Sequence, residues 1–208
     1  MRVIKPFLIA LGLILLPGVH SFNVKAAGVE ENAVEVNTFE AAAIEILSRV
    51  ETPASSVIPF VELRKNALLE QPMVLSGEID FSVPGSLSKH ITSPFEERVT
   101  ISSAAVEIER NGETRRLPLK RKKGLVEFYT GLNALLNRDV VTLMALFDVE
   151  SLSTGDTWSI VLIPTNTSLE KSLERMIITG KKTRVTVVRT VQSEDIWQEL
   201  SFGNPDSG

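Results

Sequence analysis

The side chains of this sequence that could perform acid–base chemistry are mostly carboxylates. They form three close pairs, Glu78 with Asp80, Glu96 with Glu97, and Glu107 with Glu109. Two carboxylates that flank a glycosidic bond can act as general acid and general base. The i, i+2 pairs, however, lie on the polar side of segments that alternate like strands, where carboxylates are ordinarily solvated. The pairs therefore favour a solvated surface over a hydrolytic centre.

Other catalytic and metal-binding residues are sparse. The chain has no cysteine and two histidines, and His90 is the one beyond the N-terminal segment, in what we expect to be a loop between strands. No spacing of histidine and carboxylate fits a transition-metal site, and neither a Gly-x-Ser-x-Gly elbow nor a glycine-rich phosphate loop occurs. We therefore predict no enzyme activity, no metal and no cofactor. An envelope hydrolase that uses His90 or the carboxylates is the less favoured alternative.

Composition narrows the class of partner. The chain has 208 residues, a formal net charge of −4 and 43% hydrophobic residues, which suits one domain with a sizeable core and argues against nucleic-acid binding. One basic cluster stands out, formed by Arg115, Arg116 and residues 120–123. It fits either an anionic docking surface or a solvated loop.

The N-terminus is typical of an exported protein. Arg2 and Lys5 precede the apolar run 7–16, which is about half the length that a membrane-spanning helix needs. We predict a signal peptide over residues 1–21, with cleavage as late as residue 26, and a periplasmic location. Residues 22–36 are then a polar leader, 37–202 a single domain, and 203–208 a disordered tail.

Strands dominate the predicted domain. Phe60, Glu62 and Arg64 alternate with Val61 and Leu63 over residues 58–64, and a second alternating run covers 73–83 before Pro84-Gly85. Further alternating segments are expected at 99–103, 106–110, 115–118, 148–153, 158–163, 176–178, 184–191 and 196–202. Asn111-Gly112 predicts a tight hairpin turn, since both residues tolerate positive φ.

Helical periodicity covers two regions. Apolar residues recur at helical spacing from Phe39 to about Val50, with Thr38 as the expected N-cap. A second helical region covers 125–147 and is interrupted at 137–139. These elements predict an α+β fold: a strongly curved antiparallel sheet, an unclosed half-barrel, with helices covering its concave side.

The strand and turn pattern resembles the LolA-like family of periplasmic lipoprotein carriers. The resemblance rests on Phe60-x-Glu62-x-Arg64, on the run from Pro72 through Leu75 and Gly77 to Phe81, on Thr92-x-Pro94, and on the stretch 155–164. It implies a monomeric carrier that binds a lipoprotein or lipid cargo and exchanges it between inner-membrane donor and outer-membrane acceptor proteins. A non-catalytic module that binds other envelope proteins is the alternative.

The resemblance also assigns candidate site residues. It implies that Arg64 holds a helical lid through hydrogen bonds to backbone carbonyls and releases it when cargo binds. If this strand face is concave, Glu62 and Arg64 must be paired or hydrogen-bonded there. The candidate lipid-binding residues are apolar side chains of the expected inner surface: Phe60, Ile79, Phe81, Val106, Ile108, Leu132, Leu136, Leu143, Phe147, Trp158, Ile160 and Leu162.

Overall fold

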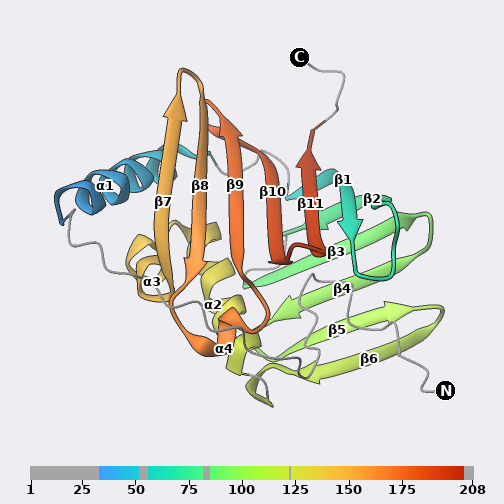
Figure 1. Cartoon of the computed structure of the whole chain (residues 1–208). Coiled ribbons are helices and arrows are strands. Elements are labelled where there is room, and N and C mark those ends of the chain that lie inside the picture. The colour runs from blue at the N-terminus through green and yellow to red at the C-terminus, as the bar shows by residue number, and fades with distance from the viewer. Residues whose placement is uncertain (1–32, 52–55, 82–84, 122, 204–208) are drawn as a thin grey trace.

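A single antiparallel sheet organises the chain. The computed structural model describes residues 33–51, 56–81, 85–121 and 123–203. Within them, an 11-stranded sheet has the order β6-β5-β4-β3-β2-β1-β11-β10-β9-β8-β7 (Figure 1). The strands are β1 (Val57–Lys65), β2 (Met73–Asp80), β3 (Ser86–Ser93), β4 (Glu97–Ser102), β5 (Ala105–Arg110), β6 (Glu113–Pro118), β7 (Phe147–Thr154), β8 (Thr157–Pro164), β9 (Arg175–Lys181), β10 (Arg184–Ser193) and β11 (Ile196–Phe202). Because β6 and β7 do not pair, the sheet stays open, which confirms the predicted half-barrel.

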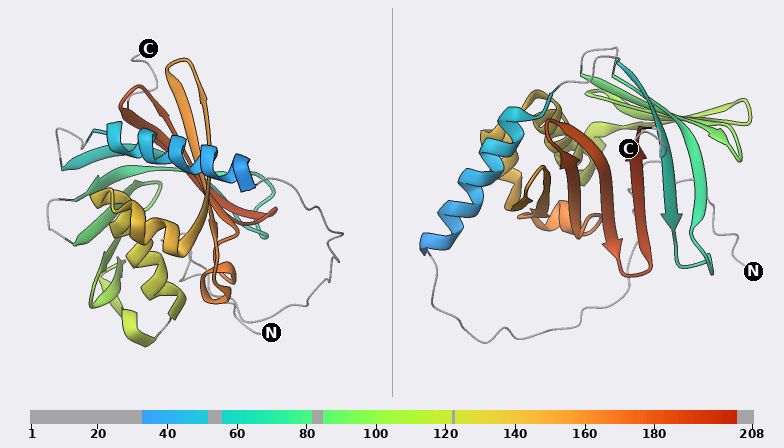
Figure 2. Two further views of the ribbon diagram at one scale, coloured as in Figure 1. Left: turned by 90° about the vertical axis from the view of Figure 1, so that its left-hand side faces the viewer. Right: turned by 90° about the horizontal axis from the view of Figure 1, so that it is seen from above.

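Helices pack against one side of this sheet (Figure 2). In the described part of the chain they are α1 (Ala33–Arg49), the short 3₁₀ helix η1 (Leu119–Arg121), α2 (Lys123–Asn137), α3 (Val140–Leu146) and α4 (Thr167–Glu170). Ile46 and Leu47 of α1, Phe128 of α2 and Leu143 of α3 join the same buried cluster as Trp158 of β8. The helices therefore cover the inner face of the sheet, as predicted.

The inner face carries two apolar clusters. The larger one lies under the helices and combines Val99, Ile101, Val106 and Ile108 with side chains of β8 and β9. The smaller one contains Phe60, Leu75, Ile79, Ile91 and Leu200, from β1, β2, β3 and β11. Alternation explains both, since every second residue of a strand points to the same face. Gly180 fits this packing tightly, because a Cβ there would lie 2.0 Å from the ring of Trp158.

Several sequence predictions are confirmed at the level of single residues. Asn111 and Gly112 both have positive φ, 53° and 76°, as the hairpin turn between β5 and β6 requires. The interruption at 137–139 separates α2 from α3, and Asp139 caps α3 by accepting a hydrogen bond from the Thr142 amide at 3.1 Å. The burial of Phe60, Glu62 and Arg64 confirms that these three residues share the inner side of β1.

Other predictions are wrong in detail. Residues 86–93 form strand β3, so His90 lies in a strand and not in a loop. Thr38 lies inside α1 and not at its N-cap, because the helix already begins at Ala33, within the range predicted as a leader. The predicted signal peptide and residues 204–208 of the predicted tail lie outside the described residues. None of the described helices is long and apolar enough to cross a membrane.

Candidate functional site

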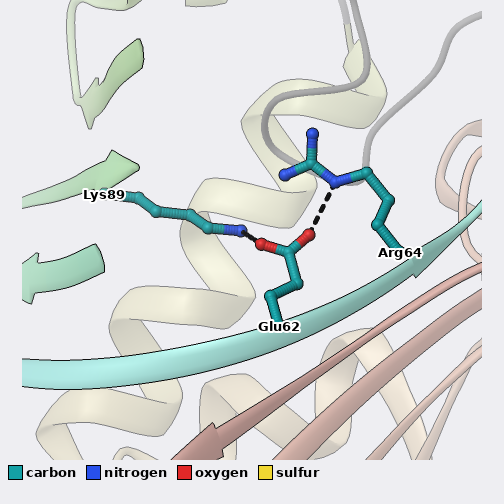
Figure 3. A network of polar contacts seen from close by, with 3 residues as sticks. All are labelled: Glu62, Arg64 and Lys89. Carbon is teal, nitrogen blue, oxygen red and sulfur yellow. Dashed lines mark hydrogen bonds and ion pairs between the residues drawn. The ribbon is translucent and has the colours of Figure 1, made fainter. Parts of the chain in front are cut away.

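Three charged side chains lie buried on the inner face of the sheet. Glu62 accepts a hydrogen bond from Arg64 Nε at 2.6 Å through one carboxylate oxygen, and from Lys89 Nζ through the other (Figure 3). Glu62, Arg64 and Lys89 are 0%, 4% and 3% exposed. We call these three residues the charged triad. Burying three charges is costly, and the cost falls only when each charge meets an opposite one at close range.

The strand geometry explains how the triad assembles. Glu62 and Arg64 are two residues apart on β1 and therefore project from the same face. Lys89 comes from β3, on the far side of β2, and its amino group lies 5.1 Å from the centre of the Phe60 ring. The long lysine side chain thus brings its ammonium group both to the carboxylate and over the face of the Phe60 ring, and the ring attracts the cation.

Burial and the charges within the triad shift the pKa values of Glu62 and Lys89. Burial raises the pKa of Glu62, but the charges of Lys89 and Arg64 and their hydrogen bonds outweigh it, so that this pKa lies below its ordinary value. Burial lowers the pKa of Lys89 to about 8, against the attraction of Glu62 and with added repulsion from Arg64. The net charge of the ionised triad is positive, because two cations share one carboxylate.

A polar row extends the triad across the sheet. Arg64 pairs with Gln198 of β11, Gln198 with Thr190 of β10, and Thr190 with Met176 of β9. Directly opposite residues of antiparallel strands share a face, so all four side chains lie on the inner side. Gln198 and Thr190 are buried. Arg64 Nη2 and Thr190 Oγ1 are both inaccessible to solvent and make no hydrogen bond to the residues that the structure describes.

The row leads into a small apolar cavity beneath α2. Its lining is Phe128, Gly131, Leu132, Leu135, Phe147, Leu162 and Met176, and its volume is about 10 Å³. A cavity of that size has room for about one water molecule, and apolar walls leave such a water without partners. Gly131 keeps the helix close to the sheet here, because a Cβ would lie 2.7 Å from the Phe147 ring. Helix α2 therefore packs closely against the sheet.

The predicted lipid-binding residues are distributed over both clusters. Val106, Ile108, Leu143, Phe147, Trp158, Ile160 and Leu162 are buried in the larger cluster, and Leu132 packs on it half-buried. Phe60 and Ile79 are buried in the smaller cluster, with Phe81 against it. Leu136 differs, since its side chain is 44% exposed. Of the proposed set, only Leu132, Phe147 and Leu162 line the cavity under α2, and the binding role of the whole set stays a prediction.

The lid-controlling role that the resemblance gives to Arg64 stays a prediction. Arg64 Nε donates a hydrogen bond to the Glu62 carboxylate. The pair is also buried, unlike the surface pair considered as the simpler alternative. Sequence reasoning missed Lys89, Gln198 and Thr190, whose positions depend on strand register. A lysine at an inward position between Leu87 and Ile91 is the signal that could have indicated Lys89.

His90 lies beside two members of the carboxylate pairs, because Glu78 on β2 is its register partner and Glu96 is its neighbour in the turn before β4. His90 faces away from the triad, with its ring nitrogens 3.2 Å from Arg98 and 3.4 Å from the exposed Glu96. Glu107 forms an ion pair with Arg116, and the buried Glu97 lies 3.4 Å from Arg110. Among the described residues, no group of three histidine and carboxylate side chains could hold a metal ion.

An open antiparallel sheet, with helices over an apolar inner face, defines a half-barrel class of protein. Residues 35–203 match the model of the family "Outer membrane lipoprotein carrier protein LolA-like", and the chain belongs to this family. A comparison with curated proteins found no match.

The solved structures that match this chain are distant in sequence. They include a LolA superfamily protein from Nitrosomonas europaea, with 9% identity, TM-score 0.41 and coverage of 80% of this chain and 92% of that one. A putative outer membrane lipoprotein-sorting protein domain from Vibrio parahaemolyticus has 12% identity, TM-score 0.41 and coverage of 81% and 92%. LprF from Mycobacterium bovis has 10% identity, TM-score 0.35 and coverage of 82% and 92%.

Proposed function

We propose that this protein is a periplasmic carrier. It binds the acyl chains of a lipoprotein or of another lipid between the helices and the inner face of the sheet. It takes this cargo from an inner-membrane donor and passes it to an outer-membrane acceptor. Family membership supports the proposal, and one structural observation carries it: helix α2 meets the sheet through apolar side chains around a small apolar cavity.

The physical basis is the non-directional nature of apolar contacts. Side chains such as Phe128 and Leu132 of α2 have no fixed partner geometry, so an acyl chain can replace their contacts with Leu162 and Met176. Each buried methylene group contributes about 0.8 kcal/mol. An acyl chain that slides under α2 therefore offsets most of the contacts that the helix gives up, and binding can remain reversible.

The helical layer is attached in a way that suits such a movement. Helices α2 and α3 lie in one continuous segment between β6 and β7. Tyr129 donates a hydrogen bond to the Gly85 carbonyl at 2.7 Å, and Thr165 donates one to Leu146 at 3.0 Å. The first bond ties the middle of α2 to the residue before β3, and the second ties the end of α3 to the residue after β8. Displacement of the middle of α2 thus breaks the exposed Tyr129 hydrogen bond but no hydrogen bond between strands.

The carrier is tested by native mass spectrometry of the protein purified from a bacterial periplasm, followed by organic extraction and lipid analysis. We expect a stoichiometric adduct of acyl-lipid mass. Leu132→Lys, which places a charge in the cavity lining, should abolish the adduct, whereas Val141→Lys on the exposed side of α3 should retain it. Circular dichroism confirms that both variants fold. A protein without adduct that also takes up no added lipid would contradict the proposal and favour an envelope interaction module.

A further inference from the structure

The binding of acyl chains does not explain the buried polar row next to the cavity. Lipid tails need apolar walls, yet Arg64, Gln198 and Thr190 lie on the same inner surface and in the same register row as Met176 and Leu162 of the cavity lining. We propose that this row binds the anionic head group, a phosphate or a carboxylate, of an amphiphilic ligand whose tail lies beneath α2. This inference rests on the proposed carrier function and narrows its cargo.

Charge is the first argument. The triad holds two cations and one carboxylate, so Glu62 neutralises only part of the positive charge. Glu97 also acts on Lys89, but Arg110 lies 3.4 Å from Glu97 and compensates it. A buried surface with excess positive charge gains from an anion, since the interaction is strong where water is excluded.

Hydrogen-bonding capacity is the second argument. Arg64 uses Nε for Glu62, and its Nη2 is buried without a hydrogen-bond partner among the described residues. Thr190 Oγ1, two strands away, is also buried without a hydrogen-bond partner among the described residues. An oxyanion offers several acceptor lone pairs and satisfies both groups, and bonds between arginine and an oxyanion are among the stronger ones in proteins. Glu62 keeps the guanidinium fixed in place, so little side-chain entropy is lost on binding.

The spacing fits an amphiphile. Neighbouring strands are about 4.8 Å apart, so Arg64 on β1 and Met176 on β9 are separated by about 14 Å along the row. Thr190 lies between them, directly next to Met176. A ligand with its head group between Arg64 and Thr190 therefore places its first methylene groups at the cavity lining. Along the row, the inner face is polar from Arg64 to Thr190 and apolar from Met176 onward. This order matches a ligand with a polar head group followed by an apolar tail.

The test compares amphiphiles that share a dodecyl chain: dodecanoate, dodecyl phosphate and neutral dodecanol. Each displaces the neutral fluorescent probe N-phenylnaphthylamine from the delipidated full-length mature protein at neutral pH. We expect the anions to bind roughly tenfold more tightly than dodecanol. Whichever anion binds more tightly distinguishes a phosphate lipid from a free fatty acid.

Variants separate the head-group site from the tail site. Arg64→Gln should bring the anions to within about twofold of dodecanol and leave dodecanol binding unchanged. Arg64→Lys should retain part of the preference. The matched control is Arg189→Gln, which removes an arginine paired with Glu199 on the outer face and should change neither affinity. Equal binding of anions and dodecanol by the wild type would overturn the head-group site alone. If none of the three amphiphiles binds, the carrier function and this inference both fail.

Discussion

The inner face of the sheet has two contrasting regions. On β8 and β9, Trp158, Ile160, Leu162 and Ile178 form a continuous apolar surface under the helices. On β1 and β3, Glu62, Arg64 and Lys89 are just as deeply buried but carry full charges. A stable core needs only the first kind of surface. The contrast is the one that the proposed head-group site requires, and the following variants test that difference.

The largest effect is expected when the triad loses its shared carboxylate. Glu62→Ala leaves Arg64 and Lys89 buried without an opposite charge between them, and it should cost about 3–5 kcal/mol in the free energy of unfolding. Urea denaturation measures this loss. Glu199→Ala is the matched control, because Glu199 pairs with Arg189 on the outer face at 3.3 Å, where a partly exposed pair contributes less than about 1 kcal/mol. Similar losses in the two variants would show that the triad is energetically an ordinary surface pair.

A smaller effect is expected when the whole triad is replaced. The triple variant Glu62→Met, Arg64→Met and Lys89→Met converts the charged region into an apolar one of similar volume. Its stability should stay near that of the wild type or exceed it by about 1–4 kcal/mol, because no charge remains to be desolvated. The variant should still bind dodecanol but lose its preference for anions. A strongly destabilised triple variant would mean that the charges are required for the fold itself.

The effect that is smallest per step of the experiment is a pH dependence that comes from Lys89. Its pKa is about 8 in the folded protein and about 10.5 when unperturbed. Between these values the unfolded state binds more protons at this residue, so stability should rise with pH by at most about 1.4 kcal/mol per unit. Denaturation curves of the wild type and Lys89→Met, compared from pH 8 upward, isolate this contribution. A difference between them that does not change with pH would contradict it.

Alternation made most of the sheet predictable from sequence. The strands around Ile108 and Ile160 alternate with apolar side chains inward, and Asn111-Gly112 marks its hairpin by residue type alone. Strand β3 escaped notice because Lys89 occupies one of its inward positions and serines surround it. A charged residue at an inward position removes the apolar period that identifies a strand.

The triad was predictable only in part. The spacing of Glu62 and Arg64 showed that they share a face, and the physics of buried charge showed that they would then need partners. The partner Lys89 comes from a strand that pairs with β2 and not with β1. Gln198 and Thr190 come from the other end of the chain and reach Arg64 through the β1–β11 and β10–β11 pairings. Register between distant strands is a tertiary property, and local residue patterns do not encode it.

The strand order also has a consequence for how the chain folds. β1 to β6 follow one another as one meander and β7 to β11 as a second, and the two join only where β1 pairs with β11, for example at Phe60 and Phe202. This seam lies in the middle of the sheet but connects opposite ends of the described chain. Contacts of such long sequence separation form slowly, because the loop-closure entropy must be overcome first. Until Ile196–Phe202 is available, β1 and β10 each present an unpaired edge, which makes β11 the strand that completes the described sheet.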